Sequence, residues 1–389
     1  MARFRLFGIV GVLCLTILIS ISGEGYSQTP TRSVQLNTDP PLQSLIPFEA
    51  ATEKPQSPVS LTFQALDAQR QPFKNAKIGL EILTPPSTPW WTTDFPIVEG
   101  TKLLAMEATA PQGRLEIQQM LPIRGNYQLR VNVSPLLAGA FTPYEQTLTL
   151  PVRENPVKYH YLGGLVIVLL GVGLLGGVVI GGQQIVQEGE IAPQRVRLLL
   201  SGLIVVAIAA LLAINISAEL LDAHGHSHEH EHTHATQSPV QQSQGLELHL
   251  VGDDLATVGQ PANFAVSLKD TTTGQPVKDI LFQVKAIALE DNLTVFAYQG
   301  IPDSSGKLAW QEQFFDGAPH KVEVTATPQP GSNRQFSPLQ VAREIEVEGI
   351  APPLFVRLIS LAYFTAIVGI GLAIGLGLKN RWFQRLVRG

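Results

Sequence analysis

Apolar and polar positions alternate with a period of two through two long stretches of the chain. In the second stretch, the alternating runs are 246–251, 263–269, 280–289, 293–298, 307–315, 321–327 and 341–347. Gly, Pro, Asn and Asp separate these runs, as turn residues separate strands. Seven short strands in about 105 residues are typical of an immunoglobulin-like β-sandwich. The pattern therefore predicts one such sandwich over residues 245–350.

The first stretch repeats the second. The matching segments are 71–74 with 275–278, 113–115 with 306–308, and 126–131 with 319–324. We therefore predict a second immunoglobulin-like β-sandwich over residues 28–157 and an internal duplication. Tyr127 is a candidate for the buried tyrosine that closes a corner of such folds, and His320 occupies the matching position.

Three uninterrupted apolar runs cover residues 162–182, 198–217 and 354–378. Each is long enough to cross a bilayer as a helix, which takes about 20 residues. Basic residues follow the third run directly, and such residues mark the cytoplasmic side of a membrane. They are Lys379, Arg381, Arg385 and Arg388. Both sandwiches are then predicted on the outer, periplasmic side of a bacterial inner membrane.

The resulting fold class is mainly β plus transmembrane α, with each sandwich followed by a spanning helix and a third helix between the repeats. The predicted helices are 158–182, 198–218 and 351–378, the cytoplasmic segments are the loop 183–197 and the basic tail 379–389, and the histidine-rich loop is 219–244.

The N-terminus has the pattern of an export signal over residues 1–27. Arg3 and Arg5 precede an apolar run over 6–19, and small residues follow it. An uncleaved anchor helix is the alternative.

Glycines recur at a spacing of four in the first and third apolar runs. They are Gly173, Gly177 and Gly181, followed later by Gly371 and Gly375. On a helix, each set lies on one face, which lets another backbone approach closely. The spacing predicts that these helices pack on each other or on a partner subunit.

Composition excludes several classes of function. Charged residues make up 15% of the 389 residues, and the net charge of −5 does not favour nucleic-acid binding. The single cysteine, Cys14, lies in the signal, so an internal disulfide is not expected. The chain carries none of the sequence motifs of the common catalytic sites, and we predict that it is not an enzyme.

Six of the nine histidines alternate along one short segment. They are His224, His226, His228, His230, His232 and His234, with Glu229 and Glu231 between them. Neutral imidazole binds divalent transition metals, and carboxylates can complete the coordination shell. Because ordering the backbone costs about 1–2 kcal/mol per residue, we expect weak and exchangeable binding. The pattern predicts capture or buffering of Zn, Ni or Co, with Cu(II) as a further option.

Two other interpretations of the segment stay open. Its imidazoles titrate near pH 6.5 and would sense pH, or the segment is a solvated spacer. His249 and His320 would join a metal site or lie on the surface as ordinary polar residues. Trp90 and Trp91 would dock on a partner or a membrane, or cap the sandwich core.

The segment from Leu308 to Pro328, centred on Phe315-Asp316-Gly317-Ala318-Pro319-His320, resembles bacterial envelope modules of the YtkA/FixH-like type. The resemblance covers the back half of one sandwich. It implies an immunoglobulin-like fold and an association with metal uptake or metalloenzyme assembly.

The leading hypothesis is a membrane-anchored accessory protein that captures metal ions and docks on a transporter or metalloprotein. The alternative is a structural or assembly factor whose sandwiches bind another envelope protein, the histidines being incidental. A small-molecule sensor or an unrecognised hydrolase is the third.

Overall fold

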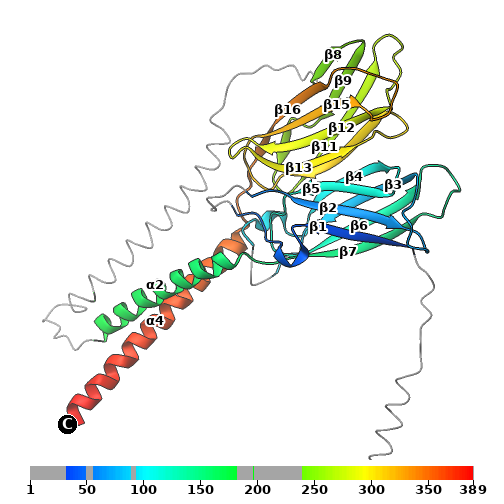
Figure 1. Cartoon of the computed structure of the whole chain (residues 1–389). Helices are drawn as coiled ribbons and strands as arrows, with labels where there is room; N and C mark the ends of the chain where they lie inside the picture. The colour runs from blue at the N-terminus through cyan, green and yellow to red at the C-terminus, as the bar shows by residue number, and fades with distance from the viewer. Residues whose placement is uncertain (1–31, 50–55, 89–92, 182–195, 197–238, 389) are drawn as a thin grey trace, which may run out of the picture.

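The computed structural model describes residues 32–49, 56–88, 93–181, 196 and 239–388, with side chains as far as residue 378 (Figure 1). Five of the predicted features lie wholly or largely outside this part of the chain. They are the signal, Trp90 and Trp91, the loop 183–197, the spanning segment 198–218, and the six histidines with Glu229 and Glu231.

Alternating side chains form the strands of the first unit. Its strands are β1 (Ser33–Asp39), β2 (Val59–Leu66), β3 (Ala76–Leu83), β4 (Lys102–Ala110), β5 (Arg114–Gln119), β6 (Gly125–Pro135) and β7 (Tyr144–Val152). Short 3-10 turns cover Leu42–Ser44 and Pro96–Val98. In β2 and β3 every second side chain is buried, and Phe63 and Ile78 are fully inaccessible. This burial of one face stabilises the sandwich.

The second unit contains all seven strands that its alternation predicts. Its strands are β8 (Val240–Ser243), β9 (Leu246–Gly252), β10 (Leu255–Thr257), β11 (Pro261–Asp270), β12 (Ile280–Ala288), β13 (Leu293–Gly300), β14 (Lys307–Gln313), β15 (His320–Pro328) and β16 (Leu339–Glu348). β8 and β10 are additions that the alternation did not predict. Each is short and lies at a sheet edge, where pairing with a neighbour forms it.

The two units share both of their sheets. One 8-stranded sheet has the order β1-β2-β5-β13-β12-β15-β16-β10, and the other has the order β7-β6-β3-β4-β14-β11-β9-β8. In Figure 1 the second unit lies on top of the first, edge to edge, and the strands of the two run on as common layers. Within each unit the order is that of an immunoglobulin-like sandwich. Between units, β5 pairs with β13, and β14 pairs with β4. We call this double junction the seam.

The seam has an internal two-fold symmetry. β5 and β14 occupy the same place in their respective units, and so do β4 and β13. Across the seam, Tyr298 pairs with Ile117 on one side, and Met106 pairs with Trp310 on the other. The repeat found in the sequence therefore carries through to the register of the hydrogen bonds, as in an isologous dimer made from one chain.

Tyr127 forms the predicted tyrosine corner. Its buried hydroxyl donates to the Ile123 carbonyl oxygen at 2.8 Å and accepts from the Ile123 amide nitrogen at 3.0 Å. These bonds satisfy backbone groups that burial would otherwise leave without partners. The matching His320 is also buried and makes one bond, 2.7 Å from Nδ1 to the Ala318 carbonyl oxygen.

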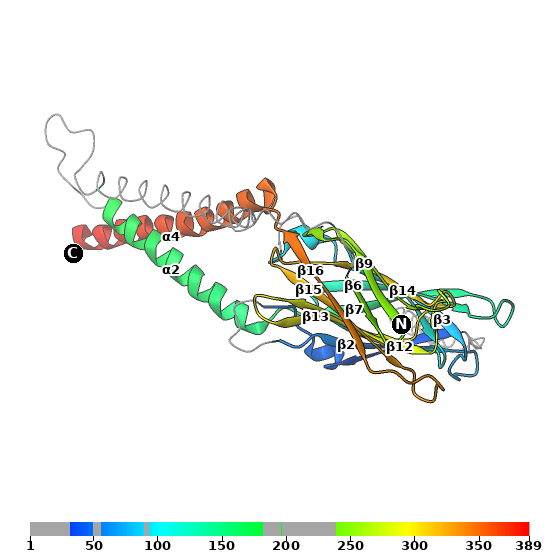
Figure 2. The ribbon, with the colours of Figure 1, turned by 90° about the horizontal axis from the view of Figure 1, so that it is seen from above.

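Two apolar helices leave the same end of the sandwich and lie side by side (Figures 1 and 2). They are α2 (Pro156–Ile180) and α4 (Leu354–Arg388). Both are long and apolar enough to cross a membrane over Pro156–Ile180 and Leu354–Leu378. Because both begin at the sandwich, the two run parallel to each other.

The glycine spacing brings the two helices together as predicted. A Cβ added at Gly177 would lie 2.9 Å from the Gly375 Cα and 2.8 Å from the Leu376 amide nitrogen. A Cβ at Gly173 would lie 3.1 Å from the Gly371 Cα. The helices therefore meet backbone to backbone along these four residues, which is how small residues pack membrane helices. Gly181 instead forms the C-cap of α2.

Ion pairs hold the start of α2 against the first unit. Lys158 Nζ lies 3.0 Å from a Glu49 carboxylate oxygen and also pairs with Asp94, and both acidic residues lie in loops of that unit. The Asn155 side chain caps the helix by accepting from the Val157 amide. The orientation of the sandwich relative to α2 is therefore constrained by side chains as well as by the chain itself.

Candidate functional site: a groove over the seam

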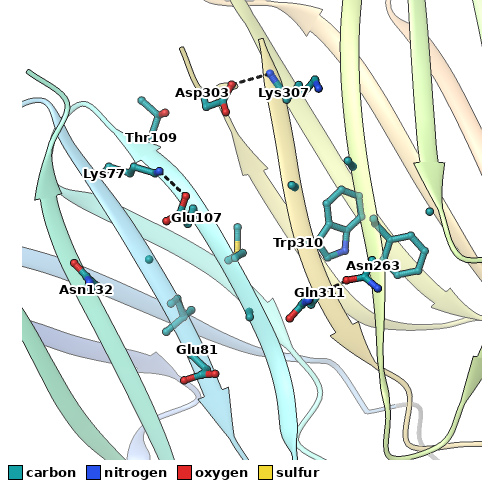
Figure 3. A pocket seen from close by; sticks show the side chains of 18 of the residues that line it. Lys77, Glu81, Glu107, Thr109, Asn132, Asn263, Asp303, Lys307, Trp310 and Gln311 are labelled. Atoms are coloured by element: carbon teal, nitrogen blue, oxygen red, sulfur yellow. Dashed lines mark hydrogen bonds and ion pairs between the residues drawn. The ribbon is translucent and has the colours of Figure 1, made fainter. Parts of the chain in front are cut away.

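An open groove of about 880 Å³ lies on the outer face of the sheet that contains β4 and β14 (Figure 3). Residues of both units line it, so it exists only because the seam joins the units. Its outward-facing lining comes from β3, β4, β6 and β7 of the first unit and from β9, β11 and β14 of the second.

Small residues form the floor of the groove. They are Gly79, Ala105, Ala265 and Ala309. Longer polar side chains stand on either side of them, so the floor is lower than the walls. A ligand can therefore approach the backbone of the sheet closely.

One cross-strand row defines the chemistry of the groove. Along it, Arg130 pairs with Glu81 and Glu81 with Ala105. Ala105 then pairs across the seam with Gln311, and Gln311 with Asn263. The Gln311 amide donates to the Asn263 Oδ1 atom at 2.9 Å. The row presents a charged end on the first unit and an amide end on the second.

The charged end consists of ion pairs. Glu81 lies 3.0 Å from Lys102 Nζ and 3.2 Å from Arg130 Nη1. Partial burial opposes its ionisation, but the bonds and charges of these two cations outweigh that effect, so the pKa of Glu81 lies below its ordinary value. Lys77 forms another pair with Glu107. The wall of the first unit is thus charged but locally compensated.

Asp303 links the charges of the two units. Partial burial raises the pKa of its carboxyl, but bonds from Ser305 and the Lys307 amide, together with the charge of Lys77, hold the pKa below its ordinary value. Lys77 belongs to the first unit and Asp303 to the second. Electrostatic attraction across the seam therefore adds to the backbone pairing.

No group of three or more His, Cys, Asp or Glu in the described ranges is arranged to hold a metal ion. His249 lies on β9 with its Nε2 atom 2.5 Å from a Glu247 oxygen, half-buried on the outer face. His320 is not the surface residue that we considered: it is buried, and its ring centroid lies 4.5 Å from that of Phe314. Burial lowers its pKa below the ordinary value. Packed and neutral, His320 is unsuited to reach a metal at the surface.

Sequence reasoning missed the groove and the polar residues under it. Gln119 and Glu312 each stand in the buried phase of a strand, at matching places in the two repeats. The sequence did offer one indication of these residues: in both repeats, a polar residue occupies a position that the alternation assigns to the buried face. The groove itself had no such signal, because it requires two strands from different units to be neighbours.

Comparisons with known proteins place the chain in no family. No family model and no curated protein matches it. Among solved structures, a copper-bound single-residue variant of FetP from uropathogenic Escherichia coli strain F11 gives a TM-score of 0.21 at 10% identity over 29% of this chain and 98% of the FetP variant. The CARDB domain of a Pyrococcus furiosus protein, solved with two metal ions, gives 0.19 at 12% over 30% and 99%.

A longer match is the adhesin InvE of Yersinia pseudotuberculosis, with a TM-score of 0.18 at 12% identity, over 82% of this chain and 61% of the adhesin. Scores this low carry no argument about relationship. The description of the chain as immunoglobulin-like sandwiches with two apolar helices of spanning length rests on its own strand order and helices.

Proposed function

We propose that this protein is a membrane-anchored accessory protein of the bacterial envelope. Its histidine segment captures divalent transition metal ions, and its fused sandwiches dock on a transporter or metalloprotein. The observation that carries the proposal is the run of six alternating histidines, which ends at His234, shortly before β8 begins at Val240.

The parallel helices support the proposed topology. The chain leaves the end of the sandwich at Pro156 and continues away from it along α2. It has returned to the sandwich by the start of β8 at Val240. If α2 spans the membrane, the intervening residues must cross it again, and the apolar segment 198–218 supplies one crossing of suitable length. The histidine segment then lies on the same side of the membrane as the groove.

Calorimetric titration of the full chain in detergent with Zn, Ni, Co and Cu(II) tests metal capture. We expect micromolar or tighter binding that disappears when the six histidines of the segment are changed to Ala. Binding should weaken at about pH 5.5, because protonation near pH 6.5 competes with the metal. The matched control is His249→Ala, which leaves the segment intact. Millimolar affinity, or equal binding in the six-residue variant, would rule the proposal out.

The full chain is needed because the second unit is not a free-standing sandwich. β13 and β14 pair with strands of the first unit, and cutting the chain between the units would expose their edges. Open edges promote aggregation. Metal binding by such a fragment would therefore not report on the native protein.

Partner binding by the sandwiches alone is the second candidate function, and the groove favours it. Its lining contains no histidine and comes from both units. In Ala105→Trp, the indole side chain would fill the floor of the groove. We expect this variant to reduce co-purification of an envelope partner by at least about tenfold, equivalent to about 1.4 kcal/mol of binding free energy.

Ala297→Trp is the matched control, because Ala297 holds the symmetry-related position on the opposite sheet, where it pairs with Gln118. Chelator should not affect co-purification if the histidines are incidental. Equal loss in both variants would show that the groove is not the binding surface.

A further inference from the structure

Two buried polar side chains meet at the seam. Gln119 ends β5 and pairs with Phe296 of β13, and Glu312 near the end of β14 pairs with Leu104 of β4. Each is only 1% exposed. The Gln119 side chain lies within bonding reach of the Glu312 carboxyl, and its amide nitrogen also donates to the Met120 carbonyl oxygen at 3.3 Å. Because the two positions are related by the internal symmetry, their contact lies at the symmetry axis, between the units.

The residues beside Glu312 in the sheet are apolar. The residues paired with Glu312 are Leu104 of β4 and Ala262 of β11. The nearest charged residues along β4 are Lys102 and Glu107, and these form ion pairs on the outer face with Glu81 and Lys77. These two ion pairs therefore lie on the other face of the sheet from the buried Glu312 carboxyl.

One side-chain oxygen of each of the two residues has no hydrogen-bond partner in the part of the chain that the structure describes. Glu312 Oε2 and Gln119 Oε1 are buried and have no hydrogen-bond partner among the described residues. A neutral carboxyl can both accept from and donate to one amide, whereas a carboxylate only accepts. The neutral form therefore suits the pair, and the ionised form leaves a buried charge with one polar partner, which is costly. Burial accordingly raises the pKa of Glu312 well above its ordinary value, against the smaller effect of Gln119.

We propose that Glu312 is a proton-operated latch between the two sandwiches. In its neutral form the carboxyl holds β14 against the first unit, and its ionisation loosens the seam. Trp310 and Gln311 line the groove and immediately precede Glu312. Opening of the latch therefore changes the shape of the groove, which makes its binding sensitive to pH.

The sign of the pH dependence follows from the direction of the pKa shift. Below the ordinary glutamate pKa of 4.5, the carboxyl carries its proton in both the folded and the unfolded state. Above that value the unfolded state loses the proton first, so the free energy of unfolding falls as pH rises. The fall continues until the pH reaches the raised pKa of the folded state and then levels off.

The test compares the wild-type full chain in nanodiscs with Glu312→Gln, by melting temperature and by amide hydrogen exchange from about pH 5 to about pH 9. The glutamine keeps the shape and both bonding roles but cannot ionise. We expect the variant to gain stability relative to wild type as pH rises. Exchange at Leu104 and Phe296, corrected for intrinsic rates, should accelerate at high pH in wild type only.

A swapped double variant, Gln119→Glu with Glu312→Gln, moves the acid to the other side of the symmetry axis. It should regain the pH dependence that the single variant loses. Glu344→Gln removes an exposed carboxylate of β16 and should behave as wild type. Parallel pH profiles for wild type and Glu312→Gln, or seam exchange in wild type that does not depend on pH after correction, would overturn the latch.

Discussion

Replacing Phe315 with alanine is expected to destabilise the protein by about 3–5 kcal/mol, the usual cost of emptying a buried phenylalanine site. Phe315 follows β14 and belongs to the second unit, but its ring packs between two rings of the first. Its centroid lies 5.3 Å from those of both Phe48 and Phe95. Its loss should therefore weaken the seam as well as the core, which hydrogen exchange of β4 and β14 measures.

Phe73→Ala is the control for this variant. Phe73 contacts Phe141 and Tyr144 within the first unit, away from the seam. It should lower global stability while leaving the relative protection of the seam strands unchanged. If both variants affect the seam equally, the aromatic cluster does not contribute specifically to the junction. A double variant with Phe48→Ala should show a coupling energy of about 0.5–1.5 kcal/mol.

Replacing Gly177 with leucine is expected to separate α2 from α4 at a cost of about 3 kcal/mol, the upper end of the usual cost of overpacking. The added side chain would meet Leu372 and Leu376 backbone atoms and the Gly375 Cα. Backbone in the middle of a helix does not move aside as a flexible side chain does. Cross-linking between cysteines placed in the two helices should therefore slow or stop.

The neighbouring Gly176→Leu gives a matched comparison. A Cβ at Gly176 meets no described atom within 4 Å, so this variant adds the same bulk to α2 away from its contact with α4. It should cross-link at the wild-type rate. Loss of cross-linking in both variants would point to a general defect in insertion and would exclude the glycine contact as the cause.

The two repeats and the glycine contact could be predicted because each leaves a periodic mark in the sequence. Alternation reports which face of a strand is buried, and spacing by four reports which face of a helix is small. Tyr127 was predictable for a similar reason, since it stands at a fixed place in a known strand pattern. The role of His320, at the matching position of the second repeat, was not predictable. His320 is buried as Tyr127 is, but it bonds to a carbonyl oxygen at a different place relative to itself.

The seam left no such mark. Hydrogen bonds between strands run in the plane of the sheet, and side chains point out of that plane. The residues of β4, β5, β13 and β14 therefore have the same alternation whether their strands are edges or interior strands. The groove and the Gln119–Glu312 contact both depend on the seam. The sequence therefore could predict neither the groove nor which residue Glu312 would contact.

By itself, the sequence determined the local elements: seven strands in the second unit, a repeat, two apolar helices with matching glycine faces, and a run of six alternating histidines. Tertiary structure decided that the two sandwiches are one continuous body, where the groove lies, and that an acid and an amide from different repeats meet in the core. The periodicity of a segment depends on which of its side chains are buried, and this is visible in the segment's own sequence. The pairing of strands across the seam depends on the free energy of the whole fold, and no single segment shows it in its sequence.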